Sequence, residues 1–192
     1  CRIISMKNGG DIPDVFARFC NLSKALEATG ASLMRNDKLG YMGTCPSNLG
    51  TGLRASVMVK LVKFNELLEN PNSSHEDKEL LEQVCAQFDL QPRGSAGEHS
   101  PAVGAKFDVS NKQRLGFSEV QLVQKMIDGV TKLIALEEKL AGGATPAQVR
   151  AEAGINTQSV CDGLLEEFKK TTGTNFEVGV DSKDSADFSY VK

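Results

Sequence analysis

The chain has 192 residues, 40% of them hydrophobic, and a formal net charge of -3 at pH 7, so it can bury the core of one domain, or of one domain with an appendage. The small acidic excess argues against general nucleic-acid binding, which usually needs a basic surface. No apolar run approaches the roughly 20 residues that span a bilayer, and no charged and then apolar leader opens the chain, so we expect a cytoplasmic protein without membrane or nucleic-acid partners.

The first predicted elements are a short strand and a helix. Residues 1–6 (Cys-Arg-Ile-Ile-Ser-Met) form an apolar run with one charge, which is typical of a buried strand. Asp11 can cap a helix that has Pro13 in its first turn, and Gly30 would end it. We expect this helix to cover one face of a sheet with its apolar stripe. The stripe consists of Ile12, Val15, Phe16, Phe19, Leu22 and Leu26.

Two further strands and a helix are predicted in the middle of the chain. Residues 55–61 alternate and are rich in β-branched side chains, which favours a strand, and residues 105–109 predict another. Between them, a loop at 70–74 precedes an amphipathic helix over residues 76–88. The inward side chains of that helix are Leu80, Leu81, Val84 and Phe88.

The longest predicted helix begins at Ser118, which forms a capping box with Gln121, and runs to about Leu140. Its apolar side chains have the spacing of ordinary core residues. They are Val123, Met126, Ile127, Val130, Leu133 and Ile134.

We place a boundary at Gly142 and Gly143, which separates a domain of residues 1–141 from an extension of residues 142–192. In the extension, Thr145 and Pro146 start one helix, residues 157–170 predict another, and the sequence after Asp181 is a polar, acidic tail. The extension either docks on the domain or serves as an interaction segment. The apolar stripe over 157–170 favours docking.

Five cysteines are scattered along the chain, without a CxxC pair or a zinc-binding spacing with histidine, and fit free thiols in a reducing compartment. They are Cys1, Cys20, Cys45, Cys85 and Cys161. Cys20 and Cys85 fall on apolar helix faces and are expected in the core.

Two glycine-bearing turns contain arginine. In the first, residues 44–54 (Thr-Cys-Pro-Ser-Asn-Leu-Gly-Thr-Gly-Leu-Arg, called here the cysteine loop), two glycines allow close backbone approach and Arg54 supplies planar charged donors. The second turn is residues 92–99 (Pro-Arg-Gly-Ser-Ala-Gly-Glu-His). Together they indicate a polyanion site beside a positioned thiol, although each alone could be a plain surface turn.

The order of these motifs resembles the C-terminal catalytic domain of the phosphagen kinases, the ATP:guanidino phosphotransferases that include arginine kinase and creatine kinase. The resemblance covers residues 1 to 141. Its landmarks are residues 2–6, Gly-Tyr at 40–41, the cysteine loop continued to residue 57, Arg-Gly-Ser at 93–95, Phe-Asp-Val-Ser-Asn at 107–111, Arg-Leu-Gly at 114–116 and Asp-Gly at 128–129. The resemblance implies an α+β fold in which an antiparallel sheet is flanked by helices, as in glutamine synthetase-like catalytic domains.

The implied activity is reversible transfer of the γ-phosphoryl group of ATP to a guanidino substrate, with Mg²⁺ held through the nucleotide phosphates. Arg2, Arg54 and Arg93 would clamp the phosphates. Backbone donors around Gly94, Ser95 and Gly97 would join them as a loop closes. The other implied nucleotide-binding residues are Ala55, Ser56, Met58, Ala96, His99 and Asp108. Arg114 is expected to hold a turn and is assigned no ligand.

Two residues are implied on the acceptor side. Cys45 would face the substrate guanidinium as a thiolate, with the Ser47 hydroxyl as a donor. Glu98 would bind the guanidinium, which makes arginine kinase the closest member, because creatine kinases carry an apolar residue there. The plainer alternatives are a thiol that only packs and an exposed loop carboxylate.

Several features depart from the family pattern. Ala96 replaces an arginine usual in arginine kinases, and Met58 replaces a histidine near the nucleotide. The family's catalytic glutamate and two more arginines lie upstream of the position of Arg2. We therefore expect the N-terminal part to be missing, the partner to be the rest of the polypeptide or a larger assembly, and the chain alone to be incomplete for turnover. The alternatives are a catalytically inactive phosphagen-kinase-like scaffolding module and a nucleotide sensor that ignores guanidino compounds.

Overall fold

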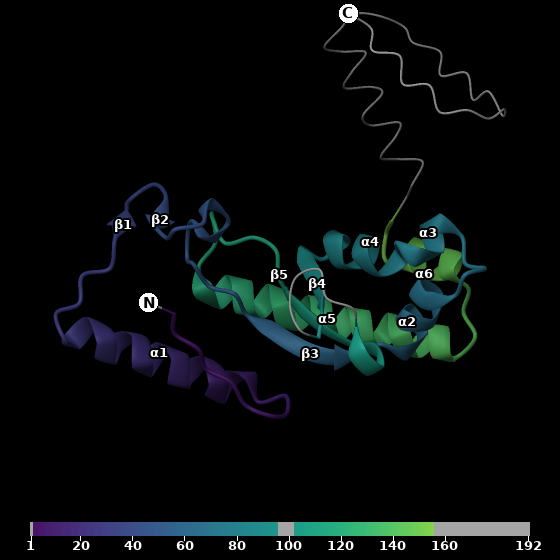
Figure 1. The fold of residues 1–192 in the computed structure, drawn as a ribbon, viewed down its shortest axis with the longest axis horizontal. Helices are drawn as coiled ribbons and strands as arrows, with labels where there is room; N and C mark the ends of the chain where they lie inside the picture. The colour runs from purple at the N-terminus through teal and green to yellow at the C-terminus, as the bar shows by residue number, and fades with distance from the viewer. Residues whose placement is uncertain (1, 96–101, 156–192) are drawn as a thin grey trace, which may run out of the picture.

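The computed structural model describes residues 2–95 and 102–155 (Figure 1). The helices are α1 (Ile12–Ala28), α2 (Val62–Glu69), α3 (His75–Lys78), α4 (Leu80–Gln87), α5 (Glu119–Ala141) and α6 (Pro146–Glu152), with short 3-10 turns η1 (Pro46–Asn48) and η2 (Val103–Ala105). The strands are β1 (Arg35–Asn36), β2 (Gly40–Tyr41), β3 (Ser56–Lys60), β4 (Leu90–Gly94) and β5 (Lys106–Asn111). The helix and tail predicted after residue 156 lie outside the described residues.

The centre of the molecule is a three-stranded antiparallel sheet with the order β3-β5-β4. Strands β3 and β5 lie where the sequence predicted them, to within two residues. Strand β4 was not predicted, because Pro92 and Gly94 are typical of a turn. Pro92 pairs with Val109, and it is tolerated because β4 is an edge strand of the described sheet.

The sheet has one apolar face and one polar face, because side chains alternate along each strand. The apolar face packs against α4 and α5 in a single core. Its buried members include Val59, Leu90, Phe107 and Val109. This confirms the predicted α+β fold, an antiparallel sheet flanked by helices, and leaves the other face without a helix among the described elements.

The predicted long helix is confirmed as α5, including the capping box between Ser118 and Gln121. Its stripe is buried at Val123, Met126, Val130 and Leu133, whereas Ile134 is exposed. The helix predicted over 76–88 is divided into α3 and α4 at Glu79. Leu80, Leu81 and Val84 are buried as predicted, and Phe88, just after α4, is only partly buried against the core. Cys85 is fully buried as predicted.

The first helix of the extension shares the core of the domain. Val149 and Ala153 of α6 are 1% and 6% exposed and belong to the same hydrophobic cluster as the sheet residues. Arg150 forms an ion pair with Asp77 of α3 at 3.0 Å. Residues 145–153 therefore dock on α4 and α5, while the stripe that motivated the docking prediction lies outside the described residues.

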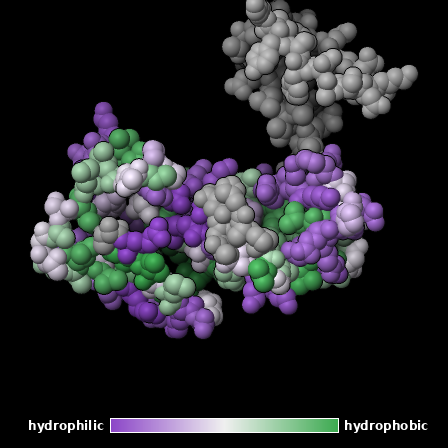
Figure 2. All heavy atoms as spheres, in the orientation of Figure 1, coloured by the Kyte–Doolittle hydropathy of each residue, from purple (hydrophilic) through white to green (hydrophobic). Residues whose placement is uncertain are grey.

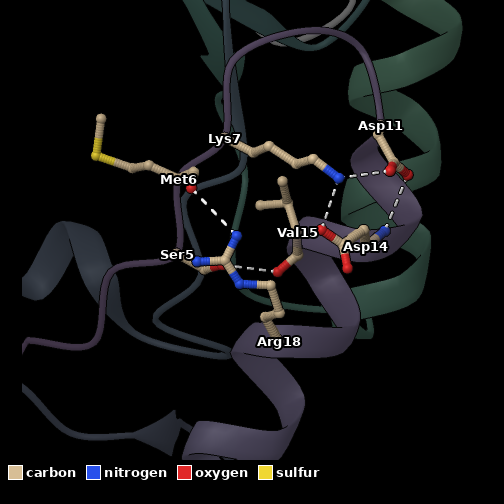
Figure 3. A network of polar contacts seen from close by, with 7 residues as sticks. All are labelled: Ser5, Met6, Lys7, Asp11, Asp14, Val15 and Arg18. Atoms are coloured by element: carbon tan, nitrogen blue, oxygen red, sulfur yellow. Dashed lines mark hydrogen bonds and ion pairs between the residues drawn. The ribbon is translucent and has the colours of Figure 1, made fainter.

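The prediction of a buried strand over residues 1–6 is wrong. The described residues 2–6 are coil, with Ile4 and Met6 61% and 77% exposed. It is held on α1 by polar contacts, in which Ser5 Oγ donates to the Val15 carbonyl at 2.9 Å and Lys7 bridges two aspartates (Figure 3). An apolar run forms a strand only beside a neighbour that can accept its backbone hydrogen bonds, and no described strand lies there.

The expected packing of α1 on the sheet is also wrong. None of its residues is buried, Cys20 is only half-buried, and Ile12 alone packs against the core. Figure 2 shows apolar side chains on the visible surface at the end of the molecule formed by α1, β1 and β2. The stripe indicates which side of the helix would be buried, but it cannot indicate that a covering surface is present.

Within residues 2–95 and 102–155, no helix combines the length and apolarity needed to cross a membrane.

Candidate functional site

The polar face of the sheet brings together five of the residues predicted to bind nucleotide. Strand register places Met58, Asp108 and Arg93 in one row across β3, β5 and β4. Ser56 lies with Ser110 and Gln91 in a second row, two residues away along the strands. Directly opposed residues of an antiparallel sheet point to the same side, and so do residues two apart along a strand. The side chains of both rows therefore lie on the face without a helix. Arg54, just before β3, reaches the same face.

Arg54 is fixed by two side chains of β5. Its Nη2 donates to Asp108 Oδ2 at 2.5 Å, and its Nε donates to Ser110 Oγ at 3.3 Å. Ser110 is fully buried beneath it, while the Arg54 side chain remains 32% exposed. A guanidinium carries five N–H donors, so three donors remain without a partner among the residues that the structure describes. They can receive an anion without breaking either contact.

Arg93 is the second guanidinium of this face. It lies opposite Asp108 in the ladder, is half-buried, and donates from Nη2 to Gln91 Oε1 at 3.4 Å. Lys60 and Lys106 oppose each other two residues further along the strands, on the same side of the sheet. Four cationic side chains therefore share this face with one carboxylate, an arrangement that attracts a polyanion locally although the whole chain is slightly acidic.

The remaining predicted nucleotide residues lie elsewhere. Ala55 packs against the core, and Gly94 is buried in the ladder opposite Phe107. Ser95 Oγ donates to the Lys106 carbonyl and accepts from the Val103 amide, both at 2.9 Å, and so ties together the two ends of the segment 96–101. Ala96, Gly97, Glu98 and His99 belong to that segment and lie outside the described residues.

Arg2 is not brought to this face by any contact in the described part of the chain. It is exposed in the coil before α1, and no hydrogen bond or ion pair joins it to residues 3–95 or 102–155. Its predicted phosphate role stays a prediction.

The turn that follows β5 supports the cysteine loop through hydrogen bonds. Cys45 is exposed, and its Sγ lies 3.0 Å from Ser47 Oγ, the neighbour predicted as a donor. Arg114 is buried and donates from Nη1 to the Ser47 carbonyl at 2.9 Å. Its own carbonyl accepts from the Thr51 amide at 3.1 Å. The prediction that Arg114 holds a turn is thus confirmed.

Gly50 makes this close approach possible. Its φ of +97° lies in the left-handed region, and a Cβ there would overlap the Arg114 carbonyl. On its other side, Gly50 exchanges hydrogen bonds with Leu39 and Tyr41, both at 2.7 Å. The glycine therefore joins the loop to two neighbouring segments at once.

Sequence reasoning missed Ser110 and Gln91, which contact the two arginines. The available signal was the alternation along residues 107–111, since Ser110 must share the side of Asp108. Gln91 gave no such signal, because β4 was not recognised as a strand.

In the described ranges, no group of three or more His, Cys, Asp or Glu side chains could hold a metal ion. Burial raises the pKa of the Cys85 thiol to about 12.

Comparison with protein families matches residues 1–140 to the model described as the ATP:guanido phosphotransferase, C-terminal catalytic domain. Among curated proteins, the chain is 48% identical over 146 residues to the testis isozyme of creatine kinase from Oncorhynchus mykiss, which covers 74% of this chain. It is 45% identical over 146 residues to B-type creatine kinase from Gallus gallus, again across 74% of this chain.

Solved structures give the same result. A lombricine kinase superposes with a TM-score of 0.60 at 40% identity and covers 74% of this chain and 37% of its own. The duplicated taurocyamine kinase from Schistosoma mansoni, with bound components of a transition-state analogue, gives a TM-score of 0.61 at 36% identity and covers 69% of this chain and 17% of its own. The chain spans 35% of the length of the two creatine kinases.

Proposed function

We propose that this chain, which belongs to the ATP:guanido phosphotransferase family, supplies the nucleotide-binding surface for reversible transfer of a phosphoryl group between ATP and a guanidino compound. The observation that carries the proposal is the position of Arg54. Its guanidinium is fixed by Asp108 and Ser110, lies on the same face as Arg93, and keeps three N–H donors free of described partners.

This geometry suits phosphoryl transfer, because the migrating group spreads negative charge over three oxygens and needs fixed positive charge more than covalent help. Arg54 and Arg93 would bind the phosphates through charge-assisted hydrogen bonds. Asp108 would hold the Arg54 guanidinium in a fixed position while the phosphate is bound and transferred. Mg²⁺ would enter with the nucleotide and neutralise further charge on its phosphates.

Met58 lies next to Asp108 in the same row and is 53% exposed. A methionine offers a polarisable surface on which a purine can pack, without the hydrogen bonds of a histidine. We propose that it lies beside the base, so that nucleotide binding depends on the phosphates more than on the base.

On the acceptor side, we propose that Cys45 faces the guanidinium and orients the attacking nitrogen. The 3.0 Å contact with Ser47 supports this role, because a hydroxyl donor stabilises a thiolate. The loop is held by Arg114 on one side and by Leu39 and Tyr41 on the other, which gives the thiol a defined position.

The acceptor that we propose is arginine or a close relative, on the ground that Glu98 offers a carboxylate to a guanidinium. The named relatives are creatine, lombricine and taurocyamine kinases, so this preference rests on Glu98 alone. Creatine is the alternative acceptor.

The test uses the full-length protein with Mg-ATP and, in turn, arginine, creatine, lombricine and taurocyamine. Formation of the phosphorus–nitrogen product is followed by ³¹P NMR. We expect phosphoarginine as the main product, and a loss of about tenfold or more in kcat/KM for arginine in Glu98→Val. Preference for creatine would overturn the arginine assignment, and no phosphorylated product with any acceptor would overturn the activity.

The second candidate is an inactive scaffolding module in the cytoplasm, favoured by Met58 where the family pattern has histidine. A scaffold would give neither heat nor a thermal shift with Mg-ADP, nitrate and arginine in any combination. A nucleotide sensor would respond to Mg-ADP and show no further response to guanidino compounds.

A further inference from the structure

Asn111, the last residue of β5, bonds to the backbone on both sides of Arg54. Its Oδ1 accepts from the Ala55 amide at 2.8 Å, and its Nδ2 donates to the Leu53 carbonyl at 3.1 Å. The side chain is 2% exposed. One buried amide group therefore spans the residue that carries the proposed phosphate contact.

These bonds matter because Arg54 lies outside the regular ladder. Strand β3 begins at Ser56, which pairs with Ser110, and the regular register of β3 with β5 ends at that pair. The Asn111 side chain, with a 3.3 Å bond from its own amide to the Ala55 carbonyl, continues the attachment to β5 past that point. The backbone of Arg54 and both partners of its guanidinium are thus fixed to the same strand.

The amide is itself held still. Its second N–H donates to the Gln113 carbonyl at 2.7 Å, in the turn that supports the cysteine loop. One acceptor and two donors in a single plane are what a carboxamide provides, and neither a carboxylate nor a hydroxyl can reproduce all three bonds.

We propose that Asn111 is a positioning residue that sets the place of the Arg54 guanidinium for phosphate binding. This inference rests on the proposed function. Asn111 touches no substrate and acts through the backbone of residues 53–55. Without it, the Ala55 amide and the Leu53 carbonyl lose their partner, and Arg54 can follow the loosened segment away from Asp108.

The test is titration calorimetry of Mg-ADP into the full-length protein and its variants. Asn111→Ala is expected to weaken binding about tenfold. In an Arg54→Gln background, the same change is expected to alter the dissociation constant by less than about twofold, because Asn111 then has no phosphate contact to position. Equal losses in the two backgrounds would overturn the positioning role.

Asn65 of α2 supplies a matched control, since it is also a buried asparagine, 9% exposed, in a helix away from this face. Asn65→Ala is expected to change the melting temperature and leave Mg-ADP affinity unchanged. If Asn111→Ala does not fold, Asn111→Asp, which keeps the acceptor for Ala55 and loses both donors, takes its place with the same expectation.

In the full-length protein, Asn111→Ala is expected to raise the KM for Mg-ATP about tenfold. A merely structural role would reduce the folded fraction, which lowers the apparent kcat and leaves KM unchanged, and that result would contradict the inference. Binding by the wild type with unchanged affinity in Asn111→Ala would overturn this inference alone. No binding of Mg-ADP by the wild type would overturn the proposed function together with it.

Discussion

The ion pair between Arg54 and Asp108 is significant for its geometry more than for its contribution to stability. The two side chains are 32% and 17% exposed, and a partly exposed pair of this kind contributes about 1 kcal/mol or less after solvent screening. What the pair supplies is direction. A guanidinium held by a carboxylate and a hydroxyl presents its other donors in a fixed plane, and such preorganisation lowers the cost of binding an anion.

Two thiols of the chain are expected to differ in reactivity. Cys45 is exposed beside Ser47, whereas burial, followed by the charge of Glu82, raises the pKa of Cys85 from 9.0 to about 12. At pH 8 the Cys85 thiolate is scarce as well as inaccessible, so its alkylation by iodoacetamide is expected to be at least about a hundredfold slower than that of Cys45. Peptide mapping by mass spectrometry after timed quenching measures both rates. Comparable rates in folded protein would contradict the burial of Cys85.

Two glycines with left-handed backbone are expected to differ in their tolerance of substitution. Gly50 has a φ of +97° and no room for a Cβ, whereas Gly116 has a φ of +85° and open space around it. Gly116→Ala is expected to destabilise the protein by about 1 kcal/mol through backbone strain alone. Gly50→Ala is expected to lose about 1–3 kcal/mol more, because the methyl group meets the Arg114 carbonyl. Urea unfolding measures the difference, and equal losses would show that the contact is unimportant.

At the scale of elements, prediction succeeded where the signals were local. Helix α5 follows from its capping box and its apolar stripe, which lie within the helix itself. Helix α2 was missed because its own cap residue, Leu61, offers no side-chain bond. Its first amides instead donate to Glu137 of α5, with Lys63 N at 2.6 Å and Phe64 N at 3.1 Å. A helix cap that is supplied by another helix cannot be recognised from the residues next to the capped helix.

Glu137 is accordingly predicted to stabilise α2. Glu137→Ala is expected to lower the free energy of unfolding by about 1–2 kcal/mol, since two helix amides lose their acceptor. Glu138→Ala, an exposed neighbour on the same helix, is the control and is expected to change it by less than about 0.5 kcal/mol. Chemical denaturation checks both variants. The capping role would be refuted by equal effects.

The charged residues at the start of α1 are expected to make the stability of the protein depend on pH. Hydrogen bonds from Lys7, then from the Asp14 amide, hold the pKa of Asp11 below 3.8, and the same aspartates raise the pKa of Lys7 above 10.5 (Figure 3). Asp11 therefore stabilises the folded protein above pH 3.8, and this stabilisation is lost as the pH falls through the lowered pKa of Asp11. Lys7 stabilises the folded protein below pH 10.5, and this stabilisation is lost as the pH rises through the raised pKa of Lys7.

Carboxyl ¹³C NMR titration of Asp11 tests this contact. We expect its midpoint to move up toward 3.8 in Lys7→Gln and to stay in place in Lys24→Gln, which alters an exposed lysine further along α1. An Asp11 midpoint that ignores the loss of Lys7 would mean that the network of Figure 3 does not persist in solution.

In the molecule as a whole, the two faces of the sheet differ in character. Helices α4 and α5 cover one face and bury the core, while the other face carries Arg54, Arg93, Asp108 and Met58. The family resemblance predicted these four residues, because their motifs are contiguous in sequence. It could not predict Asn111 as the support of Arg54, because that contact joins residues 56 positions apart.

The resemblance also did not predict that the N-terminal segment and α1 would be largely exposed. Their apolar patterns are genuine, yet burial depends on surfaces that the described residues do not provide. Local sequence thus predicted most elements, and the family resemblance named residues that share the polar face, whereas contacts between distant segments had to be observed.

We propose that the polar face of the sheet binds the phosphates of a nucleotide through Arg54. Titration calorimetry of Mg-ADP into wild type, Arg54→Gln and Arg150→Gln tests it most directly, since Arg150 is an arginine paired with a carboxylate on the helices. We predict saturable heat for the wild type, affinity weakened by at least about tenfold in Arg54→Gln, and affinity within about twofold of wild type in Arg150→Gln. No heat with the wild type, or equal affinities for wild type and Arg54→Gln, would contradict the claim.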